Sequence, residues 1–181
     1  VTIDGQASTG KSSVGQKLAQ RLDAAFLDTG AMYRGVTALA IEHGINVEDA
    51  QAVLELAKKA DLRFDWHGFP PPLMAFGRSI SSLLRSSGVD GEVSKIAALG
   101  PLREYLVELQ RSIAASKGRL VSEGRDQGTV VFPGAPVKFF LVADPMERAR
   151  RRFQQNSVSS RETPALESIY KNLLDRDRRD S

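Results

Sequence analysis

Residues 5–12 (GQASTGKS) constrain the fold of this chain more than any other segment. They match the pattern G-x-x-x-x-G-K-[ST], which binds phosphate only when a strand precedes it and a helix follows. The sequence offers that context, because an apolar run over residues 1–4 leads into the motif and a helical pattern begins at Lys11. Glycines let such a loop turn so that successive backbone N–H groups converge on a phosphate. The motif therefore predicts a P-loop on an α/β fold.

The positions of the motif have separate predicted roles at a nucleoside triphosphate. The helix that starts near Lys11 adds its positive dipole end to the phosphate site. We expect the Lys11 amine to reach the β- and γ-phosphates and the Ser12 hydroxyl to act as a ligand of Mg²⁺. ATP and Mg²⁺ are the expected co-substrate and metal ion. The residues expected to contact the nucleotide are Gly5, Gln6, Ala7, Ser8, Thr9, Gly10, Lys11, Ser12 and Ser13.

Strands and helices alternate along most of the chain. Buried strands are predicted over residues 1–4, 24–27, 120–122 and 137–142. Helices are predicted from residue 11, over residues 31–43, 48–60 (capped by Asn46) and 101–118, after Asp144, and from residue 163. On the first helix, Val14, Leu18 and Leu22 are four residues apart and predict one buried stripe. This alternation implies a parallel sheet covered on both faces.

Two short apolar segments interrupt the alternation. Residues 62–66 and 73–76, separated by Gly68 and three prolines, predict a small antiparallel sheet. A parallel P-loop sheet usually carries more than the four core strands predicted here. We therefore expect a further C-terminal strand and helix that residues 1–181 do not contain.

Composition excludes several classes of protein. The absence of cysteine rules out disulfides, thiolate metal sites and cysteine nucleophiles, and it fits a reducing, cytoplasmic location. No apolar run approaches the roughly 20 residues that span a bilayer, so we expect no membrane association. Seventeen of the 25 basic residues are arginines, and arginine is the better bidentate partner for phosphate. An anionic small ligand or a nucleic acid would both suit that charge.

The P-loop alone leaves the class of enzyme open. A switch GTPase needs an NKxD-type base-reading motif and a D-x-x-G switch, and the sequence contains neither. An AAA-type ATPase would need a longer chain and a sensor arginine region. A chain of 181 residues instead suits a small-molecule kinase with an acceptor-binding insertion and an arginine-rich lid.

Three blocks, the first of which leads into the P-loop, make the assignment more specific. Residues 3–5 (IDG), 28–34 (DTGAMYR) and 124–133 (GRDQGTVVFP) resemble those of bacterial cytidylate kinases, and the similarity continues to residues 175–181. The resemblance implies transfer of a phosphoryl group from ATP to CMP or dCMP by a monomer. It implies a P-loop three-layer α/β fold with a parallel core sheet, a small antiparallel acceptor-binding insertion and an arginine-rich helical lid. The expected core spans residues 1–34 and 119–144, the insertion about 35–118 and the lid about 145–181.

The same resemblance assigns candidate residues for the acceptor. Arg34 and Arg125 each follow a core strand, where ligands bind in open parallel sheets, and both are expected to bind the acceptor phosphate. Asp126 matches an acidic residue near the cytosine ring, where a carboxylate accepts from the exocyclic amine but would face a carbonyl of uracil. By resemblance alone, Ser94 and Arg103 contact the base, Thr29 lies near the acceptor and Asp180 contacts the ribose. Lys11, Arg125 and the lid residue Arg176 are the expected catalytic residues, and Glu123 stands where many relatives carry Asp.

Two other functions remain open from the sequence. One is a P-loop kinase for an unphosphorylated acceptor, such as a nucleoside or a shikimate-like compound, which would not need the two arginines at 34 and 125. The other is a nucleotide-dependent nucleic-acid-binding module that uses the basic C-terminal segment. That segment lacks interleaved aromatic residues for base stacking, so we expect no nucleic-acid partner.

Overall fold

The computed structural model describes residues 1–159 and 164–179, without the side chains at positions 87, 156, 158, 159, 176 and 179. The central sheet and its first helix comprise β1 (Thr2–Gly5), α1 (Lys11–Arg21), β2 (Ala25–Asp28), β6 (Leu120–Gly124) and β7 (Lys138–Leu141). Between β2 and β6 lie α2 (Thr29–Glu42), α3 (Ala50–Lys59), β3 (Arg63–Phe64), β4 (Leu73–Ala75), β5 (Arg78–Ser79), α4 (Ser87–Ala97) and α5 (Gly100–Ala115). A π-helical turn, η1 (Gln127–Val131), follows β6, and α6 (Pro145–Ser159) and α7 (Leu166–Arg179) follow β7.

Four parallel strands form the central sheet in the order β2-β6-β1-β7. β1 lies in the interior of this order, with Thr2 in register with Ser122 of β6 and with Lys138 of β7. The carboxyl ends of parallel strands meet at one edge of the sheet, which is where such folds bind ligands. A smaller antiparallel sheet has the order β3-β4-β5. The predicted α/β fold with a parallel core and a small antiparallel sheet is confirmed.

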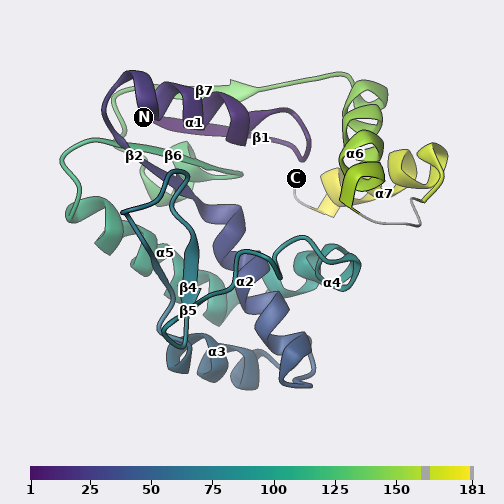
Figure 1. Ribbon diagram of the computed structural model, residues 1–181, viewed down its shortest axis with the longest axis horizontal. Coiled ribbons are helices and arrows are strands. Elements are labelled where there is room, and N and C mark those ends of the chain that lie inside the picture. Colours follow the sequence, from purple (N-terminus) through teal and green to yellow (C-terminus); the bar gives the residue numbers. More distant parts are fainter. Residues whose placement is uncertain (160–163, 180–181) are drawn as a thin grey trace.

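Different helices bury the two faces of the central sheet. Phe26 of β2 packs with Ile3, Ala19 and Val121 on the α1 side. The next residue, Leu27, points to the opposite face and joins the larger core made by α2 to α5. In Figure 1, α1 lies alongside β1, while α2 to α5 form a separate group below the sheet. The sheet is thus the middle of three layers.

The predicted apolar stripe on α1 is wrong for two of its three residues, since only Leu18 packs against the core. Val14 is 46% exposed and Leu22 is also exposed, whereas Gly15 and Ala19 are the buried positions. A Cβ atom on Gly15 would lie only 2.8 Å from Phe26 Cε2. The helix therefore packs so closely on the sheet that the small residues Gly15 and Ala19 are buried at the contact, with Leu18 partly buried beside them.

The prediction that residues 137–142 form a buried strand is also wrong. β7 occupies an end of the sheet order, so it pairs with β1 on one side only. Phe140 is 66% exposed, and Phe139 and Val142 are exposed as well. An apolar run predicted a strand correctly but could not distinguish an edge from the interior of a sheet.

The region between β2 and β6 is mostly helical. Here α4 was not predicted, since Gly88 and Gly91 interrupt its helical pattern. The predicted helix at residues 48–60 begins at Ala50, because the carboxylate of Asp49 caps it by accepting from Ala52 N at 3.0 Å. Asn46, the predicted cap, instead accepts from Glu48 N in the preceding turn.

The last two described helices, α6 and α7, pack against each other beside the P-loop (Figure 1). Asp144 caps α6 as predicted, since its carboxylate accepts from Met146 N and Glu147 N. Arg148 is 1% exposed and donates from Nη2 to Asp177 Oδ2 at 2.7 Å, which ties the two helices together. Within residues 1–159 and 164–179, no helix is long and apolar enough to span a membrane.

Candidate active site

The P-loop leaves the carboxyl end of β1 through a backbone that only glycine tolerates at two points. Gly10, which precedes α1, has a φ of 99°, in the left-handed half of conformational space. Gly5 has a φ of 145°, and a Cβ atom there would lie 2.3 Å from the backbone oxygen of Leu141. The loop therefore both turns sharply and lies directly against β7.

Polar side chains of the loop are bonded to its own backbone. Lys11 is buried at the start of α1, and its Nζ donates to the carbonyl oxygen of Gln6 at 2.9 Å. The hydroxyl of Thr9 donates to the same carbonyl, also at 2.9 Å. Since these side chains use a carbonyl oxygen, the N–H groups at the start of α1 remain the natural anion-binding groups of the loop.

Two carboxyl groups lie beside the P-loop, the half-buried Asp28 at the carboxyl end of β2 and the buried Glu123 near that of β6. Asp28 ends β2 and caps α2, accepting from Ala31 N at 2.9 Å. Glu123 lies in β6 and accepts a hydrogen bond from the hydroxyl of Ser12. Burial raises the pKa of Asp28. Burial, and next the negative charge of Asp28, raise the pKa of Glu123 to about 7.

The positive charges of Lys11 and Arg125 partly oppose this rise in the pKa of Glu123. Arg125 directly follows β6, so the structure brings this predicted phosphate ligand close to the P-loop and its two carboxyl groups. Arg85, from the segment before α4, also lies near enough to lower the pKa of Asp28. Arg34 of α2 lowers the pKa of Asp28 as well, so three arginines and one lysine lie around the carboxyl pair.

A second polar cluster forms from residues predicted to contact the base. Arg103 of α5 donates from Nη2 to Asp126 Oδ2. Tyr33 of α2 is near them, since burial first and then the charge of Asp126 raise its pKa to about 12. Residues from three different elements thus meet at Asp126. Ser94 lies half-buried on α4.

Arg34, the other predicted phosphate ligand, is held by residues of the insertion. Its Nη1 donates to the carbonyl oxygen of Leu84 at 3.2 Å and to Asp90 Oδ1 at 2.5 Å. Asp90 also accepts from Arg152 of α6. Asp90 therefore lies between an arginine of α2 and an arginine of the C-terminal helix pair.

The structure describes the side chains of two of the remaining predicted site residues, Thr29 and Ser13. Thr29 is buried, and its hydroxyl donates to the carbonyl oxygen of Glu123 at 2.8 Å, so it joins α2 to β6. Ser13 is an exposed residue of α1. Arg176 lies in α7, but its side chain is outside the description, and Asp180 lies outside the described residues altogether.

Asp4 connects β1 to the candidate site, although the sequence analysis gave it no role of its own. Its two carboxylate oxygens accept from Gln127 N and Gly128 N, both at 2.7 Å. This contact attaches the start of η1 to β1 and so positions Arg125 and Asp126, which immediately precede η1. A carboxylate within an apolar strand was the available signal, because a buried charge needs partners.

Asp28, Asp90 and Arg85 were also missed. Asp28 carried a signal, because an acidic residue directly before a predicted helix is a common N-cap. Asp90 and Arg85 carried none, since α4, which contains Asp90 and follows Arg85, was not predicted and their partners lie far away in the sequence.

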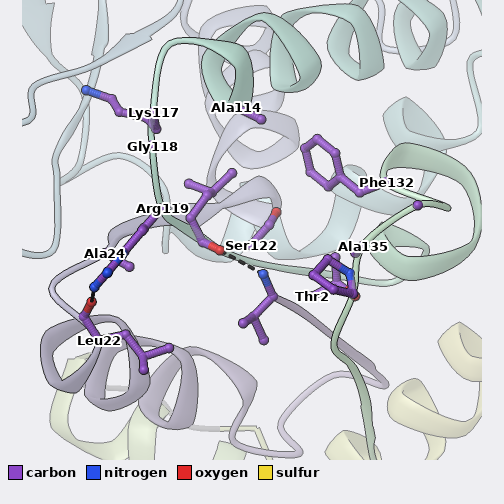
Figure 2. A pocket seen from close by; sticks show the side chains of 14 residues that line it. Thr2, Leu22, Ala24, Ala114, Lys117, Gly118, Arg119, Ser122, Phe132 and Ala135 are labelled. Carbon is purple, nitrogen blue, oxygen red and sulfur yellow. Dashed lines mark hydrogen bonds between the residues drawn. The ribbon is translucent and has the colours of Figure 1, made fainter.

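A separate hollow of about 640 Å³ lies at the other end of the sheet (Figure 2). It is bordered by the beginnings of β1 and β6, so it is remote from the carboxyl ends of the strands. Two cations border it, but Arg119 donates to the carbonyl oxygen of Leu22 at 3.2 Å and Lys117 Nζ lies 4.2 Å from the centre of the Trp66 ring. The nucleotide-binding features belong to the opposite end.

The parallel sheet, the P-loop and the cations at its edge define the chain as a P-loop phosphotransferase. A family model described as Cytidylate kinase matches residues 1–181. Cytidylate kinases of Carboxydothermus hydrogenoformans, Limosilactobacillus fermentum and Mycobacterium leprae are 41%, 42% and 44% identical to it. Each alignment covers the whole chain and 81%, 79% and 79% of these relatives. The chain belongs to the cytidylate kinase family.

Proposed function

We propose that the two polar clusters described above are the two halves of one active site, in which the terminal phosphoryl group of ATP is transferred to CMP or dCMP. The phosphorus–oxygen bond to ADP breaks, and a bond forms to a phosphate oxygen of the acceptor. The observation that carries this proposal is the pairing of Arg103 with Asp126 on the same edge of the sheet as the P-loop.

ATP binds through the P-loop in this proposal. The turn at Gly10 directs the backbone of the loop into α1, whose first N–H groups bind the phosphates. Lys11 exchanges the carbonyl oxygen of Gln6 for phosphate oxygens. This exchange costs little, because the carbonyl bond is replaced by a stronger bond between two charged groups.

The residues beside the P-loop have donor chemistry that suits Mg²⁺. Magnesium prefers oxygen ligands and keeps several water molecules, so few protein ligands are needed. The hydroxyl of Ser12 and the carboxyl groups of Glu123 and Asp28 would hold the ion or its water molecules. When bound, Mg²⁺ neutralises negative charge on the transferring phosphates. Within the described residues, no group of three or more histidine, cysteine or acidic side chains is arranged to hold a metal ion.

The acceptor binds through arginines and one carboxylate. Arg34 and Arg125 bind its phosphate, and the Asp126–Arg103 pair binds the base. Asp126 accepts from the exocyclic amine of cytosine, while the carbonyl of uracil at that position would leave two acceptors facing each other. Thr29, whose hydroxyl donates to the carbonyl oxygen of Glu123 in β6, lies near the acceptor on this side of the site.

No general base is required for this reaction. The attacking atom is a phosphate oxygen that is already ionised near pH 7. Catalysis therefore depends on alignment of the two nucleotides and on neutralisation of charge by Lys11, Arg125 and Arg176.

The C-terminal helices act as a lid over residues 1–34 and 119–144, which form the core, while about 35–118 form the acceptor-binding insertion. Arg148 Nη1 lies 3.4 Å from the carbonyl oxygen of Ala7, and Arg151 Nη1 lies 3.3 Å from that of Thr9. These contacts support a lid made of about residues 145–181. Closure excludes water, which would otherwise compete as the acceptor.

The proposal is tested by measuring ADP release with ATP and a panel of acceptors. We expect CMP and dCMP to support turnover, UMP to support less, and nucleosides or shikimate to support none. Arg125→Ala is expected to lower kcat/KM for CMP by about 100-fold or more, while Arg63→Ala, a remote exposed arginine, has no effect. Activity on an unphosphorylated acceptor without activity on CMP would overturn the proposal. A monomeric state, the absence of a nucleic-acid partner and a cytoplasmic location stay predictions.

A further inference from the structure

The carboxylate of Asp90 bridges two arginines that belong to different parts of the molecule. Its Oδ1 accepts from Arg34 Nη1 at 2.5 Å, and its Oδ2 accepts from Arg152 Nη2. Arg34 lies in α2, Asp90 in α4 and Arg152 in α6. All three side chains are less than one-third exposed. One acidic residue thus connects the region between β2 and β6 to the C-terminal helix pair.

The local structure holds Asp90 firmly in this place. Ser86 caps α4 by accepting from Val89 N, and Asp90 N donates to the carbonyl oxygen of Ser86 in the first turn. An acidic residue in the first helical turn is favoured by the helix dipole. Val89 and Val93 are buried where α4 packs against its neighbours. The carboxylate is therefore presented by a packed helix, not by a loop.

The charges of the three side chains stabilise the bridge. Burial alone would raise the pKa of Asp90, but Arg34 and Arg152 outweigh that effect and hold the pKa below its usual range. Two guanidinium groups this close would repel each other if no anion lay between them. The carboxylate reduces their combined charge to one positive unit, so the bridge keeps them adjacent.

The bridge occupies only one nitrogen of Arg34. Over the described residues, the hydrogen bonds of the Arg34 side chain to Leu84 and Asp90 both come from Nη1. A guanidinium has five N–H groups, so the Nε and Nη2 side of Arg34 remains able to bind a phosphate in bidentate fashion. Asp90 therefore orients Arg34 without taking the place of its ligand.

We propose that Asp90 is a positioning residue, which holds Arg34 in its phosphate-binding orientation and attaches α6 to α4 before nucleotides bind. The acceptor phosphate then meets an arginine that is already oriented and a lid that is already close. This inference rests on the proposed function for the role of Arg34, but the attachment of α6 to α4 does not depend on it.

The first test separates acceptor binding from chemistry. Asp90→Asn is expected to raise KM for CMP about fivefold or more, with a smaller change in kcat and none in KM for ATP. Asp90→Glu keeps the charge and is expected to recover part of the loss. Glu92→Gln removes a negative charge from the same helix, where Glu92 pairs with Lys95, and is expected to leave KM unchanged. Equal effects of Asp90→Asn and Glu92→Gln would overturn the positioning of Arg34.

The second test measures the attachment directly and needs no activity. The chain has no cysteine, so Lys58→Cys on α3 and Gln154→Cys on α6, both exposed positions, provide unique sites for spin labels. We expect Asp90→Asn and Arg152→Gln each to broaden the nucleotide-free distance distribution toward longer distances. The double variant is expected to broaden it no further. A distribution unchanged by Asp90→Asn would overturn the attachment, whereas broadening in a protein that fails to phosphorylate CMP would overturn only the proposed function.

Discussion

Ser12 of the P-loop donates a hydrogen bond to Glu123 of β6, across 111 residues of sequence. The bond joins the start of α1 to a carboxyl group that burial and Asp28 keep protonated far above the usual pH range, with a pKa of about 7. Near pH 7 the Glu123 carboxyl group is therefore only partly ionised, and the empty site carries less negative charge than two fully ionised carboxylates would give it. This relationship has a measurable effect on stability.

We predict that Glu123→Gln stabilises the nucleotide-free protein at pH 8. The ordinary pKa of a glutamate is 4.5, and the folded value is about 7, so between these values the folded state binds more protons than the unfolded state. Stability is therefore highest below about pH 4.5 with respect to this group and falls as pH rises through 7. Gln removes that fall, and we expect a gain of about 1–3 kcal/mol at pH 8 and none at pH 4.5.

Urea unfolding without Mg²⁺ at several pH values measures this gain. Glu108→Gln, at an exposed position of α5, serves as the control for loss of one negative charge. Parallel stability curves for Glu123→Gln and the wild type would contradict the prediction. In the presence of ATP and Mg²⁺ the order is expected to reverse, because Gln is a weaker ligand for the ion than a carboxylate.

We predict that Asp4→Asn lowers stability by about 1–3 kcal/mol and weakens CMP binding more than ATP binding. The amide can accept only one of the two backbone N–H bonds that Asp4 accepts from η1. Arg125 and Asp126, which precede η1, would then lose their fixed position. Urea unfolding and separate KM values for the two nucleotides measure both effects.

Thr2→Val is the matched control for Asp4→Asn on the same strand. In the part of the chain that the structure describes, the buried hydroxyl of Thr2 has no hydrogen-bond partner. Its replacement by a methyl group is therefore expected to be neutral or slightly stabilising. A larger loss of stability in Thr2→Val than in Asp4→Asn would show that packing at β1, and not the carboxylate of Asp4, causes the destabilisation.

We predict that Gly5→Ala and Gly91→Ala change stability in opposite directions. A Cβ on Gly5 would lie 2.3 Å from a backbone oxygen of β7, which cannot move without separating the strands. We expect a loss of at least about 2 kcal/mol and much weaker ATP binding. Gly91 is exposed in α4 with nothing within 4 Å of its Cβ position, and alanine there is expected to add about 0.5–1 kcal/mol. Thermal unfolding with and without ATP measures the stability and the ATP binding of both variants. If the two variants lose similar stability, the close contact of Gly5 with β7 is not the cause.

We predict that Asp126→Asn reduces discrimination between CMP and UMP. The amide can donate to the carbonyl of uracil as well as accept from the amine of cytosine, and Arg103 loses its charged partner. The ratio of kcat/KM for CMP to that for UMP is expected to fall about tenfold or more. Glu104→Gln, on the exposed face of α5 beside Arg103, is expected to leave the ratio unchanged. An unaltered ratio in Asp126→Asn would exclude Asp126 from base selection.

Local patterns predicted the parts of the fold that depend on neighbouring residues. The P-loop, the helix after Asp144 and the helix that carries Leu102 and Leu106 all follow from caps, glycines or apolar spacing, and the structure contains each of them. The prediction of an apolar stripe on α1 was largely wrong because Gly15 lies close to Phe26, a contact that no local pattern encodes. α4 was not predicted because its stability comes from packing against α2 and α5 rather than from its glycine-containing sequence.

The residues of the candidate site also differ in whether a local pattern predicts them. The motif residues at 5–13 and the residues carried by resemblance could be named from the sequence alone. Asp90 could not, because its role depends on a group 62 positions away in the chain. The carboxylate of Asp4 indicated a need for partners, but the sequence did not show that these lie 123 positions away. Residues that contact a ligand recur within short motifs, whereas residues that position them depend on the finished fold.

The order of the central sheet also bears on how the protein is made. β1 pairs with β6 and β7, so this strand has its strand partners only after residues 120–141 have been synthesised. Contacts so distant in sequence form slowly. Until then the P-loop has neither the strands that support it nor Arg148 and Arg151. The segment that most clearly predicts nucleotide binding is thus among the last to become able to bind, and a stalled nascent chain would expose it together with an unpaired apolar strand.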